Sequence, residues 1–431
     1  MSAIARLLQA RGHQVSGSDA GRWPLSEALR EDGMVVHDSF AAGHTAGADV
    51  VLRSSAYGEQ NVEVADARER GVTVWKRDDA WRELSAGQRV VAIAGTHGKT
   101  TTTAMTWTAL RAGGVDASLI CGAPLQDLGS NAHAGSDPVL VIEADEYDRA
   151  FLALTPEIGV VTNVDHDHVD VYPTAAEYAA AFARFAGQVR GTLLVCADDA
   201  GSRLLTGPAV VRYGTAAEAD RRITARTTSS DKQTFTITGP DTLAVSLGVP
   251  GLHNARNAAG ALLAASAAGA APASLGAALA AFRGTSRRLE VLGTVDGVVV
   301  VDDYAHHPAE IRSGLEAYAP AGRRIVVFQP HTPSRLAAFF SEFVAVLRSA
   351  DVAIVVETFS SAREATDAGP DSGARRLAAA AGATYAGTVE DAARAAAVAA
   401  RRGDVVLVMG AGDIRPAAVR LLALLAARPA A

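Results

Sequence analysis

The chain has 431 residues, of which 49% are hydrophobic and 20% are charged, and its formal net charge is −7. This length predicts about three domains, and the acidic balance gives no electrostatic reason to expect a nucleic acid or an anionic membrane as a partner. With two cysteines, no signal-peptide pattern and no apolar run long enough to span a membrane, the sequence predicts a cytoplasmic protein with free thiols.

Apolar runs of strand length alternate with alanine-rich helical stretches along most of the chain. The runs start at Val90, Val139, Gly159 and Thr192, and again at Val298, Arg324, Val352 and Asp404. Continuous runs of Val, Ile and Leu are typical of strands that helices cover on both faces. The pattern therefore predicts an α/β protein built on parallel sheets.

Two polar interruptions predict domain boundaries. The segment LSAGQR at 84–89 precedes a new strand, and FRGTSRR at 282–288 separates a helical region from the strands of the last third. We therefore expect domains at residues 1–87, 88–284 and 285–431.

The strongest local motif is GTHGKTTTT, at residues 95–103, which follows a predicted strand and opens a helical stretch that ends at Gly113. Glycines allow backbone amides to approach phosphate oxygens, Lys99 adds a positive charge, and the Thr100 hydroxyl is a ligand for Mg²⁺. The motif departs from the general phosphate-loop pattern because Ile93 stands at the position of its first glycine. Strand, lysine and helix nonetheless occur in the order that an ATP site requires. The predicted site comprises Gly95, Thr96, His97, Gly98, Lys99, Thr100 and Thr101.

Two acidic segments supply candidate metal ligands. EADEYD at 143–148 and DHDHVDVY at 165–172 each follow a predicted strand, and strand ends are where parallel sheets present functional groups. Either segment alone is explained by a solvated acidic turn. Two of them after successive strands, downstream of a phosphate loop, favour a Mg²⁺ site that serves phosphoryl transfer.

At these segments the sequence resembles the Mur ligase family, and the resemblance covers nearly the whole chain. The matching segments follow the family's order: VSGSDA and SSA near the N-terminus, GTHGKTTTT, EADEYDRAFL, TNVDHDHVDVY, GLHNARNAAGA at 251–261, SRRLEVLG, VDDYAHHP, FQPHTPSR and VLVMGAGD. The resemblance implies a three-domain α/β architecture. Its parts are a Rossmann-like UDP-binding N-terminal domain, a P-loop ATPase central domain and a Rossmann-like C-terminal domain.

The resemblance also implies an activity, because His97 is typical of the alanine-adding member of the family. That activity is ATP-dependent ligation of L-alanine to the lactyl carboxylate of UDP-N-acetylmuramate through an acyl phosphate, in peptidoglycan precursor synthesis. The implied cofactors are ATP with Mg²⁺ or Mn²⁺, the implied partners are the two substrates, and the implied state is a monomer or homodimer.

Individual residues take implied roles by the same resemblance. Lys99 is expected to clamp the β- and γ-phosphates, and Thr100 to hold one Mg²⁺. Glu143 and His168 are expected to hold a second Mg²⁺. The implied ATP contacts outside the loop are Asn254 and Asn257 for adenine, and Arg288 and Asp303 for phosphate and ribose. The implied catalytic set is Lys99, Glu143, His168 and Arg288.

Substrate contacts are implied in the N-terminal and C-terminal domains. For the UDP-sugar they are Ser18, Asp19, Ser54 and Ser55, with Asn131 near the sugar. For L-alanine they are His306 and Arg335, because a planar guanidinium suits an α-carboxylate. Arg335 is equally well explained as a surface charge at a helix N-terminus, and His306 as a structural imidazole.

Several departures from the family pattern accompany the resemblance. The family's first strand and glycine-rich turn are expected before Met1, so we expect the recorded start to be an internal methionine. Tyr147 replaces a serine, Leu289 replaces a phenylalanine, and Thr332 stands where many members have arginine.

Two alternatives stay open. The recycling ligase, which attaches an intact tripeptide to UDP-N-acetylmuramate, shares EADEYD, whereas TNVDHDHVDVY and FQPHTPSR favour the alanine-adding member. An inactive nucleotide-binding relative is favoured by the absent glycine-rich turn and opposed by the intact set of Lys99, Glu143 and His168.

Overall fold

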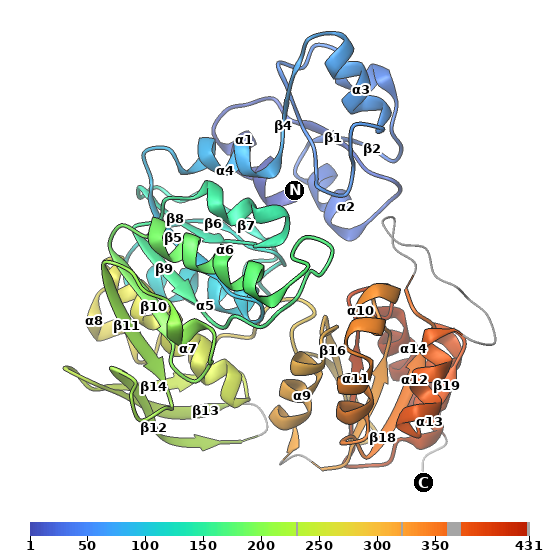
Figure 1. Cartoon of the computed structure of the whole chain (residues 1–431). Helices are drawn as coiled ribbons and strands as arrows, with labels where there is room; N and C mark the ends of the chain where they lie inside the picture. Colours follow the sequence, from blue (N-terminus) through green and yellow to red (C-terminus); the bar gives the residue numbers. More distant parts are fainter. Residues whose placement is uncertain (230–231, 320–321, 360–371, 429–431) are drawn as a thin grey trace. The chain divides into compact units, whose positions relative to one another are not determined.

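The computed structural model describes residues 1–229, 232–319, 322–359 and 372–428. By their internal contacts these residues form two compact units (Figure 1). The first unit holds Met1–Arg226, Thr234–Leu247 and Arg256–Phe282, and the second holds the described residues within Thr227–Gln233, Gly248–Ala255 and Arg283–Ala431. Each unit is built around its own sheet.

Short helices and strands open the first unit. They are α1 (Ser2–Ala10), β1 (Ser16–Ser18), α2 (Pro24–Glu31), β2 (Val35–His37), η1 (Ala42–Thr45), β3 (Val50–Leu52), α3 (Val62–Glu69), β4 (Thr73–Trp75) and α4 (Arg77–Ser85). Strand β1 pairs in parallel with β2, and β3 pairs in parallel with β4. Helices α1 and α4 bury Ile4, Leu7, Trp81 and Leu84 in the same core as the large sheet that follows. This shared core joins the opening segment to the rest of the unit.

The large sheet has ten strands among the described residues, in the order β14-β13-β12-β11-β10-β9-β5-β8-β6-β7. Their bounds are β5 (Arg89–Ala94), β6 (Ser118–Ile120), β7 (Ala132–His133), β8 (Val139–Glu143), β9 (Ile158–Val161), β10 (Thr192–Cys196), β11 (Ala209–Gly214), β12 (Arg221–Thr228), β13 (Gln233–Thr238) and β14 (Leu243–Leu247). The middle strands β6, β8, β5, β9, β10 and β11 are parallel. The four strands predicted in this part of the chain are confirmed as β5, β8, β9 and β10.

Helices cover the middle of this sheet on opposite faces. They are α5 (Lys99–Ala112) and α6 (Ala175–Gln188), which Figure 1 shows behind and in front of the sheet, together with α7 (Leu252–Ala267) and α8 (Pro272–Leu275). Helix α6 buries Tyr178, Phe182 and Phe185 in the same hydrophobic core as alternate residues of β5. Because β5, β8 and β9 are parallel neighbours, the segments that follow them meet at one edge of the sheet.

The second unit has a six-stranded sheet among its described residues, in the order β15-β16-β20-β17-β18-β19. Its strands are β15 (Glu290–Val295), β16 (Val298–Asp303), β17 (Arg324–Phe328), β18 (Val352–Val356), β19 (Thr384–Ala386) and β20 (Val405–Met409). All pairs are parallel except β15 with β16. The strands predicted at Val298, Arg324, Val352 and Asp404 are therefore confirmed.

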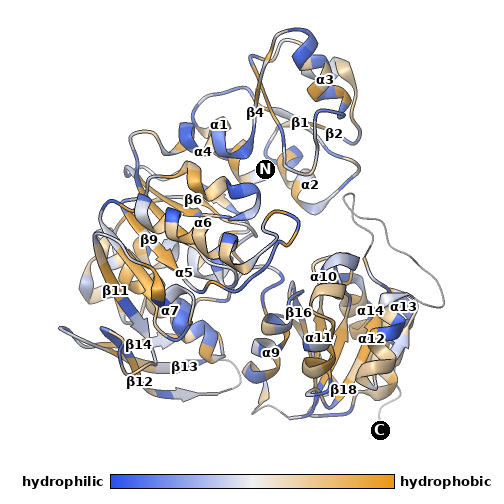
Figure 2. Cartoon of the chain, in the orientation of Figure 1, coloured by the Kyte–Doolittle hydropathy of each residue, from blue (hydrophilic) through white to orange (hydrophobic). Residues whose placement is uncertain are grey.

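Helices also cover both faces of the second sheet, whose strands are strongly hydrophobic in Figure 2. They are α9 (Pro308–Ala317), α10 (Pro333–Ala338), α11 (Phe340–Leu347) and α12 (Gly373–Ala381) on one core, and α13 (Val389–Ala399) and α14 (Arg415–Ala426) on the other. Strands enclosed in this way explain the continuous apolar runs of the sequence.

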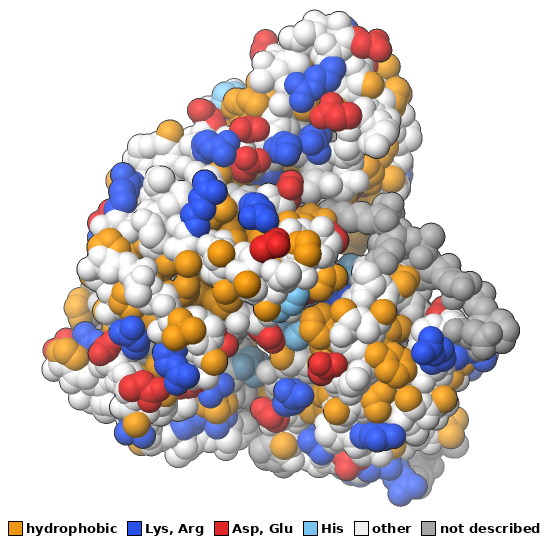
Figure 3. Space-filling model, viewed as in Figure 1, with side chains coloured by type: hydrophobic (Ala, Val, Ile, Leu, Met, Phe, Trp, Pro, Cys, Tyr) orange, Lys and Arg blue, Asp and Glu red, His pale blue; other side chains and the backbone are white. Residues whose placement is uncertain are grey.

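The surface carries charges of both signs. On the face drawn in Figure 3, basic and acidic side chains are intermixed over both units. Across the described residues, no helix combines the length and the apolar composition needed to cross a membrane.

Candidate functional site

A glycine-containing loop connects β5 to α5 at the edge of the large sheet. Gly95 has a φ of 133° and Gly98 a φ of 81°, values that favour glycine. A Cβ atom on Gly98 would lie 2.7 Å from Asn257 Oδ1, so the loop also needs glycine for close packing against α7. Helix α5 begins immediately afterwards, at Lys99. The loop therefore sits at a helix N-terminus, where backbone amides and the helix dipole favour an anion such as phosphate.

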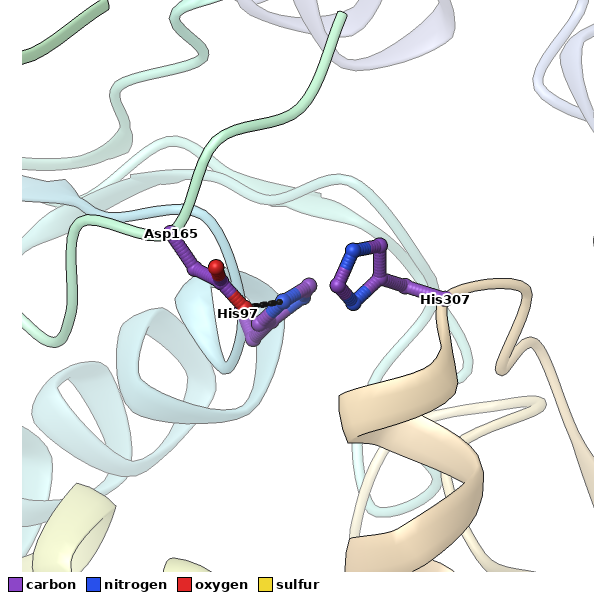
Figure 4. Close-up of side chains that lie close together, drawn as sticks. All are labelled: His97, Asp165 and His307. Carbon is purple, nitrogen blue, oxygen red and sulfur yellow. Dashed lines mark ion pairs between the residues drawn. The ribbon is translucent and has the colours of Figure 1, made fainter. Parts of the chain in front are cut away.

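The segment that follows β9 holds this loop in place. Thr96 Oγ1 donates to the backbone oxygen of Asp165 at 2.8 Å. The His97 backbone N–H donates to Asn163 Oδ1 at 2.9 Å, and Asn163 Nδ2 donates back to the His97 oxygen at 2.9 Å. The His97 imidazole points toward the Asp165 carboxylate, with 3.5 Å between Nε2 and Oδ2 (Figure 4). His97 is thus fixed through both its backbone and its ring.

The Lys99 side chain folds back over the loop. Its Nζ donates to the backbone oxygens of Gly95 at 2.6 Å and Thr96 at 2.9 Å, and it lies 2.9 Å from Glu146 Oε2. Burial by itself would lower the pKa of Lys99, but the negative charges of Glu146 and Asp145 outweigh it and raise that pKa. Lys99 is therefore a largely buried cation directed at the phosphate-binding loop.

Thr100 and Glu143 lie beside the loop and offer two oxygen atoms that could bind a metal ion. Thr100 Oγ1 donates to Glu143 Oε1 at 3.0 Å, and the Gly122 backbone N–H donates to Glu143 Oε2 at 2.6 Å. The Cys121 thiol lies 3.8 Å from the same Oε2 atom. A hydroxyl and a carboxylate are hard oxygen ligands of the kind that Mg²⁺ takes next to phosphate. The donor set therefore fits this ion.

His168 lies in an acidic environment on the loop after β9. Its Nε2 is 3.3 Å from Glu146 Oε1, and ligand atoms of Asp145, Glu146 and His168 lie within 4.8 Å of one another. Burial disfavours the charged imidazole, but the hydrogen bond to Glu146 and the charge of Asp167 raise the pKa of His168 overall. His168 has a φ of 52°, a strained value of the kind found at functional sites.

Tyr147 connects the two acidic segments. Its hydroxyl donates to Asp170 Oδ2 at 2.9 Å, and its ring meets the His168 ring edge-on, with 5.1 Å between centroids. Asp145 pairs with Arg77 from α4, with 2.5 Å between Nη1 and Oδ2. The serine replaced by Tyr147 would be too short for the contact with Asp170.

Asn254 and Asn257 lie on α7. Asn254 Nδ2 donates to the backbone oxygen of Pro250 at 2.7 Å, and both asparagines are nearly buried. Asn257 packs against Gly98 of the phosphate loop, whereas Asn254 belongs to the second unit. The structure therefore places Asn257 beside the phosphate loop, whereas Asn254 forms a hydrogen bond with the backbone just before α7.

The predicted UDP-sugar contacts lie at the end of β1 and after β3. Ser18 Oγ lies 3.4 Å from His44 Nδ1, and Ser54 Oγ accepts a hydrogen bond from the Ala56 backbone at 3.0 Å. Burial, together with the charge of the hydrogen-bonded Asp19, raises the pKa of Tyr57. The Asp19–Tyr57 contact therefore brings these two segments together. Ser55 follows Ser54 directly in the second segment and is half-buried.

Asn131, predicted near the sugar, is 3% exposed and has two protein partners in α1. Its Oδ1 accepts from Arg6 Nη1 at 2.8 Å, and its Nδ2 donates to Ser2 Oγ at 3.0 Å. In this structure Asn131 anchors α1 to the edge of the large sheet.

In the second unit, Arg288 and Asp303 lie near the end of β16. Arg288 Nη1 is 3.6 Å from Glu310 Oε1, and its guanidinium lies over the Tyr304 ring at 5.1 Å. Asp303 accepts backbone hydrogen bonds from Leu289 at 2.9 Å and from Ala305. Burial raises the pKa of Asp303 to about 7, although the charge of Arg288 acts in the opposite direction.

His306 and Arg335 converge on a third side chain, His331. The His306 and His331 rings meet with centroids 5.8 Å apart, and Arg335 Nη1 donates to His331 Nδ1 at 3.4 Å. His306 Nδ1 donates to the Tyr304 backbone oxygen at 2.9 Å. Thr332, the residue in the place of the family's arginine, caps α10 by accepting from the Arg335 backbone. These residues form a polar cluster at the ends of β16 and β17.

His307, the third side chain drawn in Figure 4, belongs to the second unit. It precedes α9 as its N-cap, and its Nδ1 accepts from the Ala309 backbone N–H at 3.3 Å. Its ring also meets Phe339 edge-on at 4.6 Å. These contacts give His307 a role in starting α9.

Comparison with known proteins identifies the family. UDP-N-acetylmuramate–L-alanine ligase of Chloroflexus aggregans is 44% identical over 98% of this chain and 95% of that protein. The enzyme of the same name from Kineococcus radiotolerans is also 44% identical, over 99% and 94%. The chain belongs to the Mur ligase family. Three family models match this Mur ligase in succession: the Mur ligase family catalytic domain at 1–89, the Mur ligase middle domain at 93–265, and the Mur ligase glutamate ligase domain at 287–412.

Solved structures show the same three-domain Mur ligase architecture. The crystal structure of UDP-N-acetylmuramate–alanine ligase from Thermotoga maritima matches with a TM-score of 0.83 and 26% identity, covering 98% of this chain and 96% of that one. A murein peptide ligase from Psychrobacter arcticus matches with a TM-score of 0.73 and 25% identity, covering 100% and 97%.

Two residues at the centre of this Mur ligase site escaped the sequence analysis: Glu146 and Asn163. Glu146 lies in the acidic segment EADEYD at 143–148, but four carboxylates within six positions give no sign of which one turns inward. The chain there leaves β8 for a 3-10 turn, η2 (Tyr147–Ala153), with positive φ at Asp148 and Arg149, so strand periodicity does not apply. Asn163 lay inside the TNVDHDH segment, and its two bonds to His97 depend on the pairing of β5 with β9.

Proposed function

We propose that this Mur ligase joins L-alanine to the lactyl carboxylate of UDP-N-acetylmuramate with ATP, in the synthesis of a peptidoglycan precursor. The observation that carries the proposal is the cluster of Lys99, Thr100 and Glu143 at the start of α5, where a cation and two oxygen ligands meet a phosphate-binding loop. The name shared by the curated relatives supplies the substrates of the proposal.

The proposed reaction has two steps. A carboxylate oxygen of UDP-N-acetylmuramate attacks the γ-phosphorus of ATP, the bond from that phosphorus to the bridging oxygen breaks, and ADP leaves behind an acyl phosphate. The deprotonated amine of L-alanine then attacks the acyl carbon, and the tetrahedral intermediate expels phosphate to leave the amide. The first step brings two anions together, so positioning and neutralisation of charge dominate the catalysis.

The residues of the first unit take roles that follow from their chemistry. Lys99 neutralises phosphate charge, and the glycine loop with the first amides of α5 orients the triphosphate. Thr100 would hold one Mg²⁺, and Glu143 with His168 a second, and these ions would supply further positive charge next to the phosphate oxygens. Asn257 borders the loop on the side of α7 and is proposed to contact adenine.

We assign the amino-acid end of the reaction to the second unit. His306, His331 and Arg335 gather there, and a guanidinium pairs well with the α-carboxylate of L-alanine. We further propose that Arg288 and Asp303 contact the phosphate and ribose of ATP. Asn254 is proposed to contact its adenine.

Phosphate release tests the proposed function directly. Purified protein is incubated with ATP, Mg²⁺ and UDP-N-acetylmuramate, with and without L-alanine, and the released phosphate is measured. The mass of the nucleotide-sugar product is determined by mass spectrometry. Release that requires both UDP-N-acetylmuramate and L-alanine, with a product heavier by one alanyl residue, is the expected result. Phosphate release at the same rate with and without L-alanine would contradict the proposal.

The recycling ligase is the second candidate, because a murein peptide ligase shares the fold over the whole chain. The same assay with the tripeptide L-alanyl-γ-D-glutamyl-meso-diaminopimelate in place of L-alanine separates the two. We expect turnover with L-alanine and none above background with the tripeptide.

Replacement of Arg335 by alanine is expected to raise the KM for L-alanine by about 10- to 100-fold, because a charged hydrogen bond to the carboxylate is lost. The KM for UDP-N-acetylmuramate should stay unchanged. Arg335→Lys should restore the KM only in part, since an ammonium lacks the planar pair of donors. Arg348→Ala, on the exposed end of α11 in the same unit, is the matched control. An equal rise in both KM values would point to a structural role for Arg335.

A further inference from the structure

Glu146 is a fully buried carboxylate between the phosphate loop and the acidic segment after β9, and its side chain is 0% exposed. Lys99 Nζ lies 3.0 Å from Oε1 and 2.9 Å from Oε2, and His168 Nε2 lies 3.3 Å from Oε1. A buried carboxylate is strongly unfavourable unless charged or polar groups compensate it. Glu146 is therefore compensated by two groups to which the proposed reaction gives roles.

Two buried tyrosines also donate hydrogen bonds to Glu146. Tyr178 OH donates to Glu146 Oε1 at 3.2 Å and lies 2.9 Å from Thr96 Oγ1 of the phosphate loop. Tyr172 OH donates to the Glu146 backbone oxygen at 2.7 Å. Burial raises the pKa of Tyr178, so its hydroxyl remains a neutral donor. Both the backbone and the carboxylate of Glu146 are thus held by the protein interior.

We propose that Glu146 is a positioning residue that orients Lys99 and His168 together. The proposal rests on the proposed function only for the identity of the substrates on which Lys99 and His168 act. The Glu146 carboxylate contacts both groups. It sets the direction of the Lys99 ammonium at the phosphate loop and that of the His168 imidazole on the loop after β9. Lys99 Nζ also donates to the backbone oxygens of Gly95 and Thr96, so Glu146 is the charged one of the groups that set its direction.

A Glu146→Gln variant keeps the shape of the side chain and removes its charge. Because an amide holds an ammonium less firmly than a carboxylate does, Lys99 loses its fixed direction. We expect the Kd for a nonhydrolysable ATP analogue with Mg²⁺, measured by calorimetry, to rise about fivefold or more. In a Lys99→Met background the same change should alter the Kd less than about twofold, because the group through which Glu146 acts is gone.

Activity supplies a second readout. We expect Glu146→Gln to lower kcat about 100-fold, the effect of misplacing a group by about 1 Å. Its effect should shrink to a few-fold in a His168→Asn background, and Glu146→Asp should recover part of the kcat. Glu177→Gln, on the exposed first turn of α6, is the matched control and should leave both Kd and kcat unchanged.

Three outcomes would overturn the proposal: an unchanged or lower Kd in Glu146→Gln, an equal rise of Kd in the Lys99→Met background, or losses of kcat that simply multiply with His168→Asn. If the wild-type protein shows no turnover that depends on L-alanine, the proposed function fails. The Kd measurements then still test the positioning role, because they require only nucleotide binding.

Discussion

A Lys99→Met variant should lose kcat by about 10²- to 10³-fold and also become less stable. The first effect follows because the loop loses the cation that neutralises phosphate charge in the proposed reaction. The second follows because Glu146, which is 0% exposed, loses the ammonium 2.9 Å from its carboxylate. Removing one partner of a buried ion pair typically costs about 3–5 kcal/mol, since the other charge stays buried without compensation.

A second variant separates these two effects. In Lys99→Met/Glu146→Gln the buried charge is removed together with its partner, so the free energy of unfolding in urea should recover most of the loss. The kcat should stay low, because the lysine is still missing. If the double variant is no more stable than Lys99→Met, the instability does not come from the uncompensated Glu146 carboxylate.

A Gly95→Ala variant should lose both the loop geometry and nucleotide binding. Gly95 has a φ of 133°, and a Cβ atom there would lie 2.0 Å from Thr162 Oγ1 and 3.0 Å from the Thr162 backbone nitrogen. The hydroxyl of Thr162 has no room to move aside freely, because it donates to the His97 backbone oxygen at 2.6 Å. Backbone strain and overpacking of this kind together cost about 2–5 kcal/mol.

Gly114→Ala is the matched control for this prediction. Gly114 also has a positive φ, 83°, but nothing lies within 4 Å of a Cβ atom built there. Its free energy of unfolding should fall by about 1–2 kcal/mol because of backbone strain alone, and its Kd for the nucleotide should not change. Urea unfolding and calorimetric titration with the ATP analogue measure both quantities. Equal losses in the two variants would mean that the contact with Thr162 contributes nothing.

Much of the fold was predictable because its signals are local. Each buried parallel strand is a continuous apolar run, so the runs at Val90, Val139 and Gly159 were visible without knowing their partners. The phosphate loop was visible for the same reason, since strand, glycines, Lys99 and α5 are contiguous in the chain. The roles assigned to Arg335 and His306 remained divided between function and structure, because His306 meets His331 and Arg335 from a different loop, the one after β16.

The sequence by itself determined the class of fold, the order of its elements and the segments that carry the chemistry, because these depend on short-range pattern and backbone geometry. Only the tertiary structure decided which carboxylate meets which cation. Glu146 lies 47 residues from Lys99 and reaches it because β5 and β8 are parallel neighbours whose ends meet at one edge. Asn131 shows the same limit, since its contacts with α1 join residues more than 120 positions apart. Pairings over such separations depend on the register of strands and the packing of helices, and no local pattern encodes them.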